Sequence, residues 1–351
     1  MEKKTVEELN EIRKRIFRKN LIVILATVAV IITSFFVAMK IGPTQISFGE
    51  ILGLLAGNGS AGDIYVMRDI RLPRILCCAM VGAALSVAGV AMQGLFRNPM
   101  ASPSVLGVSS GAAFGASLAM GFGVGSVLGS YAVPMLAFVF CFGTMFLVYI
   151  LAKTSGGVSV AMLLLAGIAV GAFFNGMVSA IQYIADDSTL PGIVYWLMGS
   201  FSACGWSSFR LAIVPIMAGI ILIWFCSKEL NLISLGEEQA ENLGVNVNRT
   251  RILLLVGSSL AVAGAVSISG IIGFVGLIIP HIFRMIVGPD HKFLIPLSII
   301  GGAAFLMVMD AVSRWVISPN ELPIGILTAL LGAPFFIYIM RTKRKFMLGG
   351  D

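Results

Sequence analysis

Charged residues are scarce in this chain, since Asp, Glu, Lys and Arg make up 12% of its 351 residues. A soluble globular domain usually carries about twice that share, and here 58% of the residues are hydrophobic. This composition excludes a water-soluble globule. Because roughly 20 apolar residues cross a bilayer as a helix, and several uncharged stretches reach that length, we expect an all-α integral membrane protein.

The chain also has few residues suited to catalysis or metal binding. Its five cysteines show no CxxC spacing and lie mostly in hydrophobic runs, which favours packing over a disulfide or a metal site. Its two histidines, His281 and His291, make no ligand cluster. A G-x-x-x-x-G-K-[ST] loop is absent, so the chain is not expected to bind ATP. We expect no catalytic residue, metal or cofactor on this chain, and no enzyme activity of its own.

The hydrophobic runs predict about ten membrane-spanning helices, counted at roughly 20 residues each. The run from Asn98 to Ala152 is long enough for two spans, which are expected to meet in the glycine-rich segment from Gly121 to Pro134. The expected spans lie near residues 21–39, 72–95, 103–121, 131–152, 159–184, 207–227, 250–270, 272–288, 295–315 and 323–340.

Basic residues cluster at both ends of the chain, where seven precede residue 20 and four follow residue 340. Lysine and arginine near span ends favour the cytoplasm, so both termini are expected there, in agreement with an even number of spans. This gives a cytoplasmic segment at 1–20, a transmembrane domain at 21–340 and a cytoplasmic tail at 341–351, in the cytoplasmic membrane. The net charge of +7 lies mostly in these tails and indicates contact with acidic lipids rather than nucleic acid.

A polar segment at residues 231–251 separates the predicted sixth and seventh spans and is expected in the cytoplasm. Ser234 and Glu237 match a capping box, and Gly244 can end a helix in the left-handed conformation. The pattern predicts a short helix over about 235–243, with acidic residues in water. Two interpretations stay open: a docking surface for a partner in water, or a helix lying on its own protein. The apolar residues are Leu235, Ala240 and Leu243, and those expected in water are Glu237, Glu238 and Glu241.

Glycines recur every four residues within the predicted spans, at Gly107, Gly111 and Gly115 and again at Gly167 and Gly171. Small residues at this spacing let helix backbones approach closely in a membrane. Packing inside one bundle is the favoured interpretation, and contact with a second copy is the alternative.

Three amides, Gln93, Asn175 and Gln182, fall within predicted spans. Such groups either bond neighbouring helices or line a wet path. Bonding between helices is the commoner use.

Several long motifs resemble one known family. They include RDIRLPR (68–74), GFVGLIIPHIFR (273–284), ELPIGILTALLGAPFF (321–336) and, within the polar segment, LGEEQAENLG (235–244). In these stretches, and across roughly residues 45–340, the chain resembles the permeases of binding-protein-dependent ABC importers that take up iron-siderophores, haem or cobalamin.

The resemblance implies a ten-span permease subunit that imports a metal chelate, with an iron-siderophore favoured over haem or cobalamin. It implies pairing with a second copy or a close paralogue, two cytoplasmic ATPase subunits that bind ATP and magnesium, and an extracytoplasmic substrate-binding protein. The missing phosphate loop fits this division of labour, because energy must then enter from a partner.

The resemblance also assigns roles to residues. The segment at 231–249 corresponds to the family's ATPase-coupling helix, with Leu235, Gly236, Glu237, Ala240, Leu243 and Gly244 as the coupling residues. Arg71, Arg74 and Arg314 correspond to the arginines that meet acidic residues of the binding protein. Local pairing is the alternative for them, with Asp69 near the first group and Asp310 one turn from Arg314. The inner gate corresponds to Asn98, Met100, Ser159 and Val160, although the family often has leucine at 100 and threonine near 160.

A second hypothesis is an ion-coupled or proton-coupled secondary transporter. Such a protein needs ionisable groups near the middle of the membrane. Asp310 is the acid closest to a span, and it lies towards a span end. The ABC permease is therefore the favoured prediction.

Overall fold

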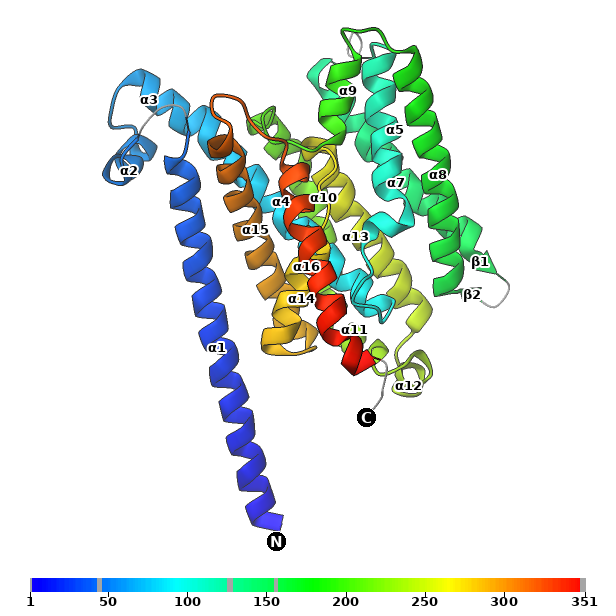
Figure 1. Ribbon diagram of the computed structural model, residues 1–351. Helices are drawn as coiled ribbons and strands as arrows, with labels where there is room; N and C mark the ends of the chain where they lie inside the picture. Colours follow the sequence, from blue (N-terminus) through cyan, green and yellow to red (C-terminus); the bar gives the residue numbers. More distant parts are fainter. Residues whose placement is uncertain (1, 43–45, 125–128, 155–156, 348–351) are drawn as a thin grey trace.

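The structure, a computed structural model, describes residues 2–42, 46–124, 129–154 and 157–347. These residues form a bundle of helices with one two-residue strand pair (Figure 1). The elements are α1 (Glu2–Lys40), α2 (Phe48–Ala56), α3 (Ala61–Tyr65), η1 (Val66–Arg71), α4 (Leu72–Leu95), η2 (Pro103–Leu106), α5 (Val108–Gly121), η3 (Gly129–Tyr131), α7 (Ala132–Ala152), β1 (Lys153–Thr154), β2 (Gly157–Val158), α8 (Val160–Ile184), α9 (Leu190–Leu197), α10 (Trp206–Phe225), α11 (Ser227–Ile233), α12 (Glu237–Asn242), α13 (Val247–Ser269), α14 (Val275–Val287), α15 (His291–Val316) and α16 (Ile324–Met347).

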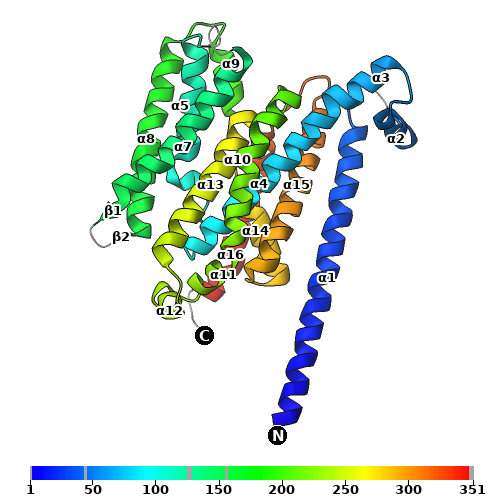
Figure 2. The same cartoon turned by 180° about the vertical axis from the view of Figure 1, so that it is seen from behind.

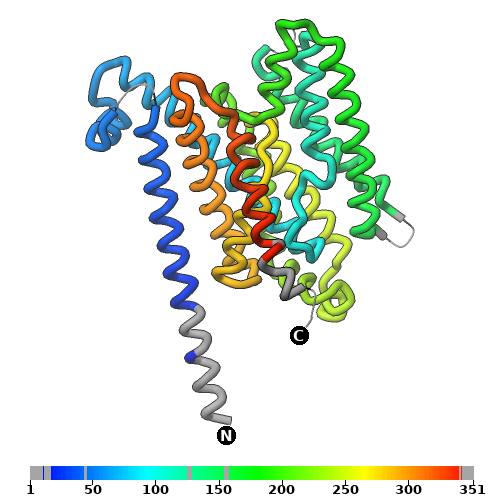
Figure 3. The backbone as a smooth tube through the Cα atoms, in the orientation of Figure 1, coloured from blue at the N-terminus to red at the C-terminus, as the bar shows by residue number. Residues whose placement is uncertain are grey.

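The bundle has two distinct ends. One carries α12 and the β1–β2 pair, and the opposite one carries α2, α3 and α9 (Figure 1). We call them the α12 end and the α9 end. Both α4 and α13 run from one end to the other (Figure 3).

Each of the ten predicted spans falls on a helix. Seven segments in the described residues are long and apolar enough to cross a membrane, namely α1, α4 with the short helices α3 and η1 before it, α7 with η3, α8, α10, α13 and α15. The other three predicted spans correspond to η2 with α5, to α14 and to α16. A multi-pass membrane fold is therefore clear, whereas the number of crossings stays a prediction.

Two of the predicted spans are shorter than expected because the backbone turns before them. Helix α14 has 13 residues, since Gly270 and Phe274, between α13 and α14, both adopt a positive φ of 67°. Helix α5 has 14 residues and starts after Gly107, whose φ is 75°. Helices of this length rise about 20 Å, less than the hydrocarbon thickness.

Helix α4 is the centre of the bundle. It packs against α10, α13, α14 and α15, and Figure 2 shows it between α10 and α15. In its span 83% of the 18-residue apolar stretch is buried, whereas the corresponding share is 17% for α1 at the periphery. Two glycine pairs set this packing: a Cβ on Gly82 would lie 2.1 Å from the Gly302 carbonyl oxygen, and one on Gly89 would lie 1.8 Å from that of Gly276. No side chain fits at either crossing.

Replacing Gly89 with alanine should therefore destabilise the protein. The added methyl overlaps the α14 backbone, and overpacking of this kind typically costs about 1–3 kcal/mol. Gly143→Ala on α7 is the matched control, because its Cβ meets nothing within 4 Å and a helical Gly→Ala change should gain about 0.5–1 kcal/mol. Thermal unfolding in detergent measures both, and a Gly89→Ala protein as stable as Gly143→Ala would contradict the crossing.

Candidate functional site

Helix α12 begins at Glu237 without the predicted capping box. The hydroxyl of Ser234 donates to the Leu230 carbonyl at 2.8 Å, because Ser234 follows directly on α11 and bonds back one turn. Gly236 is the residue before α12, with a φ of 137° that favours glycine. The helix therefore starts on a glycine turn, and the predicted capping box is wrong.

One side of α12 is buried and the other is open. Ala240 is fully buried against Ile233 and Val247. Leu235 and Leu243, which flank the helix on either side, are 65% and 62% exposed. The prediction that a helix forms here is correct, but two of its three apolar residues face outward. Between them lie the exposed acids Glu238 and Glu241. We call these four exposed residues, Leu235, Glu238, Glu241 and Leu243, the α12 surface.

Arg251, at the start of α13, joins α12 to the strand before α8. Its Nη2 donates to Glu237 Oε1 at 2.7 Å, and its Nη1 donates to the Val158 carbonyl at 2.6 Å. The guanidinium is almost fully buried. Glu237 is therefore half-buried and paired, not in water as predicted. Residue 251 lies at the edge of the predicted polar segment, and nothing in the sequence indicated its partners.

Asn231 on α11 forms a second polar contact, with the residues at the start of α15. The Asn231 side chain accepts from the His291 backbone N–H at 2.9 Å and lies 2.7 Å from His291 Nδ1. Its amide nitrogen donates to Asp290 at 2.8 Å. A Cβ on Gly94, near the end of α4, would lie 2.8 Å from His291 Nε2. Helices α4, α11 and α15 thus meet at His291. The described residues hold no cluster that could bind a metal ion.

The predicted gate residues occupy turns at the starts and ends of helices. Asn98 accepts from the Met100 backbone N–H at 2.9 Å, and Met100 is 39% exposed. Ser159 accepts from the Met162 N–H at 3.1 Å and so begins α8, with Val160 as its first residue. Among the described residues, no hydrogen bond joins the first pair to the second. Their role as a gate stays a prediction.

The predicted packing glycines lie at close approaches within the chain. A Cβ on Gly107 would be 2.8 Å from the Gly167 carbonyl of α8. On Gly111 it would be 2.7 Å from the Phe140 carbonyl, and on Gly115 2.3 Å from the Leu136 carbonyl, both on α7. Helix α5 therefore needs these glycines for contacts with its own neighbours, which is the favoured of the two interpretations.

At the α9 end, Arg71 and Arg314 bond the last carbonyls of α1. Arg71 donates to the Met39 carbonyl at 2.6 Å. Arg314 donates to the Ala38 carbonyl at 3.0 Å and also to that of Ile41. The last carbonyls of a helix lack partners of their own and carry its negative dipole end. The two guanidinium groups therefore cap α1.

Arg74 completes this network with two acids. It donates to Asp310 at 2.8 and 3.0 Å and to both oxygens of Glu321 at 2.9 Å, while Arg314 pairs with the same Asp310 at 3.0 Å. We call Arg71, Arg74, Arg314, Asp310 and Glu321 the arginine network. Its arginines are 4%, 8% and 8% exposed, in that order. This geometry matches local pairing rather than an open socket, and Asp69, expected as a partner, is exposed.

Of the polar residues in spans, Gln93 bonds a neighbouring helix, whereas Asn175 is exposed. Gln93 donates to the Gly276 carbonyl of α14 at 3.3 Å. Asn175 and Ser179, one turn apart on α8, are both exposed, and 28% of the α8 window is buried. Gln182 is half-buried further along α8. Exposed polar side chains inside a span usually face a protein partner or water rather than lipid.

Asp310→Asn should destabilise the fold, because Arg74 and Arg314 would lose the carboxylate between them. Removing one partner of a buried ion pair costs about 3–5 kcal/mol. Asp69→Asn is the matched control, since an exposed substitution usually changes stability by less than about 0.5 kcal/mol. Denaturant unfolding in detergent gives both values. Equal stability of the two variants would show that the network does not hold the α9 end.

The chain is similar in sequence to known transport proteins. The sequence model of the FecCD transport family matches residues 29–342. The hemin transport system permease protein HmuU of Yersinia pestis is 40% identical over 82% of this chain and 87% of its own. The molybdate import system permease protein MolB of Haemophilus influenzae is 40% identical over 91% and 95%.

The fold also has a solved counterpart. A structure described as an inward-facing conformation of a metal-chelate type ABC transporter superposes with a TM-score of 0.81 and 38% identity, over 91% of this chain and 98% of that one. The family match covers residues 29–342, and the solved fold covers a similar share of the chain. The chain therefore belongs to the FecCD transport family.

Proposed function

We propose that this chain, a permease subunit of an ABC importer, carries a metal chelate across the cytoplasmic membrane and receives its energy through α12. The observation that carries the proposal is the Arg251 bridge. A single buried guanidinium bonds both Glu237 on α12 and the Val158 carbonyl, two residues before α8 begins. A displacement of α12 therefore reaches the start of α8 directly.

ATP hydrolysis is proposed to occur on two separate ATPase subunits, which bind the ATP and magnesium. The chain has no phosphate-binding loop of its own. The α12 surface presents two exposed leucines beside two exposed acids, a mixture of apolar anchor and polar rim that suits a protein interface. On this proposal the α12 end, with both chain termini, faces the cytoplasm.

The alternative of a secondary transporter has less support. Such a protein needs an acid that can change its charge within the membrane. Asp310 is fully buried and paired with two arginines, so its carboxylate is engaged in holding helices together and is not open to a transported ion.

The transport path is proposed to run along α8 and to be completed by a second permease subunit, identical or paralogous. The exposed Asn175 and Ser179 on α8 support this, because neither suits contact with lipid. The turns at Asn98–Met100 and Ser159–Val160 would gate this path near the α12 end.

The substrate-binding protein is proposed to dock at the α9 end. The arginines of the network are buried and bonded inside the chain, so their proposed part in docking is to hold the surface in place. That surface includes the loop with Asn320, which is exposed, and Glu321, which is half-exposed.

A metal chelate is the proposed substrate class, with an iron-siderophore first. The solved metal-chelate type transporter and the hemin permease among the relatives support it. The molybdate permease MolB makes molybdate the competing substrate.

Replacing Leu235 and Leu243 with serine should reduce ATP-driven uptake about tenfold or more, because each leucine loses the apolar area it would bury against the ATPase. Leu52→Ser on α2 is the control, since Leu52 is 64% exposed at the other end. Uptake is measured in vesicles holding permease, ATPase and binding protein, with labelled ferric siderophore, haem, cobalamin or molybdate. Uptake that survives an inactivated ATPase but stops when the proton gradient collapses would overturn the proposal.

Arg251→Lys should lower the substrate transported per ATP hydrolysed. A lysine ammonium keeps the charge but lacks the planar fork that bonds two acceptors at once. Arg249→Lys is the control, because Arg249 is exposed on the same helix turn. Glu237→Gln should lower the same ratio, and the two effects should not add, since both break one bridge. A loss of stability with an unchanged ratio would reduce Arg251 to a structural role.

A further inference from the structure

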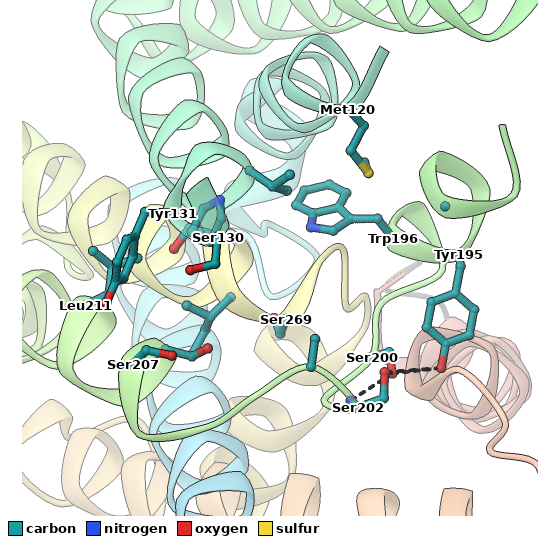
Figure 4. A pocket seen from close by; sticks show the side chains of 17 residues that line it. Met120, Ser130, Tyr131, Tyr195, Trp196, Ser200, Ser202, Ser207, Leu211 and Ser269 are labelled. Carbon is teal, nitrogen blue, oxygen red and sulfur yellow. Dashed lines mark hydrogen bonds between the residues drawn. The ribbon is translucent and has the colours of Figure 1, made fainter. Parts of the chain in front are cut away.

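Two cavities meet on the α7–α10 side of the bundle, away from the proposed transport path. The first is a chamber of about 380 Å³ at the α9 end, between α9, the start of α7, the start of α10 and the end of α13 (Figure 4). The second is a groove of about 440 Å³ that starts beside it. Both volumes fall in the range of small-molecule sites. They share Pro134, Leu211 and Ser267, so they form one continuous site.

The chamber is lined by hydroxyl groups. Seven of its lining residues are serines, at positions 130, 200, 202, 207, 208, 267 and 269. Figure 4 shows the Tyr195 hydroxyl directed at Ser200, at 3.1 Å, and Ser200 bonded to Ser202 at 3.1 Å. Within the described residues, no hydrogen bond engages the side chains of Ser130, Ser207 or Ser208. The chamber thus offers several donors and acceptors to a polar guest.

The groove is apolar and follows the helices away from the chamber. Helix α13 packs against both α7 and α10 and forms its floor, as Figure 2 shows with α13 between the other two. Its outer edges, Val139 on α7 and Val214 on α10, are 58% and 71% exposed. Along α10 it extends from Leu211 to Ala218, about 10 Å of helix rise. A guest in the groove therefore lies along a membrane span.

The lining also constrains the charge of the guest. None of the residues that line the chamber or the groove is charged. An anionic headgroup would therefore lose water without gaining a lysine or arginine partner, which is unfavourable. Tyr131, Tyr195 and Trp196 in the chamber wall are the residue types that gather at the level of lipid headgroups. Sugar hydroxyls suit a chamber of serine and aromatic side chains.

We propose that this site binds a neutral glycolipid, with the sugar in the hydroxyl chamber and one acyl chain in the α7–α10 groove. The site is separate from the proposed path along α8, because no α8 residue lines either cavity. Its occupant holds α9 and the starts of α7 and α10 at a fixed distance from the end of α13.

Native mass spectrometry of the full chain in detergent tests this, with monoglucosyl-dioleoylglycerol and dioleoyl-phosphatidylglycerol as probes. The glycolipid should remain bound at concentrations about tenfold lower than the phospholipid. Ala218→Trp fills the groove and should weaken glycolipid binding about tenfold or more, since an acyl chain loses several buried methylenes. Met217→Trp is the control, because Met217 directly precedes Ala218, is 46% exposed and does not line the groove.

The chamber is tested by the double variant Tyr195→Phe with Ser200→Ala. Loss of these hydroxyls should weaken glycolipid binding about tenfold and leave phosphatidylglycerol binding unchanged. Equal retention of both lipids by the parent protein overturns the proposal, as does equal binding by the two tryptophan variants. Displacement of the glycolipid by haem or a ferric siderophore also overturns it, because the chamber would then belong to the transport path.

Discussion

The close approach of α4 to α14 and α15 is the constraint on which the other features depend. In a membrane, helices gain no hydrophobic drive from each other, so contact distance and backbone packing decide how they associate. Gly82 and Gly89 let α4 touch the carbonyls of its neighbours. Arg74 at the start of α4 then meets Asp310 of α15, and Gly94 near its end meets His291. One helix therefore positions the polar contacts at both ends of the bundle.

At both ends of the bundle, buried arginines bond acceptors on other elements. A guanidinium has several donors in a fixed plane and can bond two acceptors from different elements. Arg71 and Arg314 use it to bond the carbonyls that end α1, and Arg251 uses it to join α12 to the strand before α8. Buried charges of this kind persist when each finds a carboxylate or a backbone acceptor. At the α9 end these bonds hold the surface in place, and at the α12 end they link α12 to the start of α8.

The sequence predicted elements well and long-range partners poorly. Uncharged runs of about 20 residues mark spans directly, so all ten predicted spans coincide with helices. Ser234 was misassigned because a serine between two helices can cap the next one or bond back to the last. The burial of Arg74 depends on acids 236 and 247 positions away, which spacing cannot reveal. Ala240 and Leu243 both look apolar, and only the packing of Ile233 and Val247 decides which one is buried.

The size and anchoring of α12 fit the coupling role proposed for it. It has six residues, fixed to the bundle by buried Ala240 and by the bond from Glu237 to Arg251. On that proposal, a force on the leucines that flank α12 passes to these two contacts, because a helix of six residues bends little. Through Arg251 it reaches Val158 and then α8, which has 25 residues and spans about 37 Å. Because α8 is a continuous helix that reaches the α9 end, a tilt at its start would displace its far end.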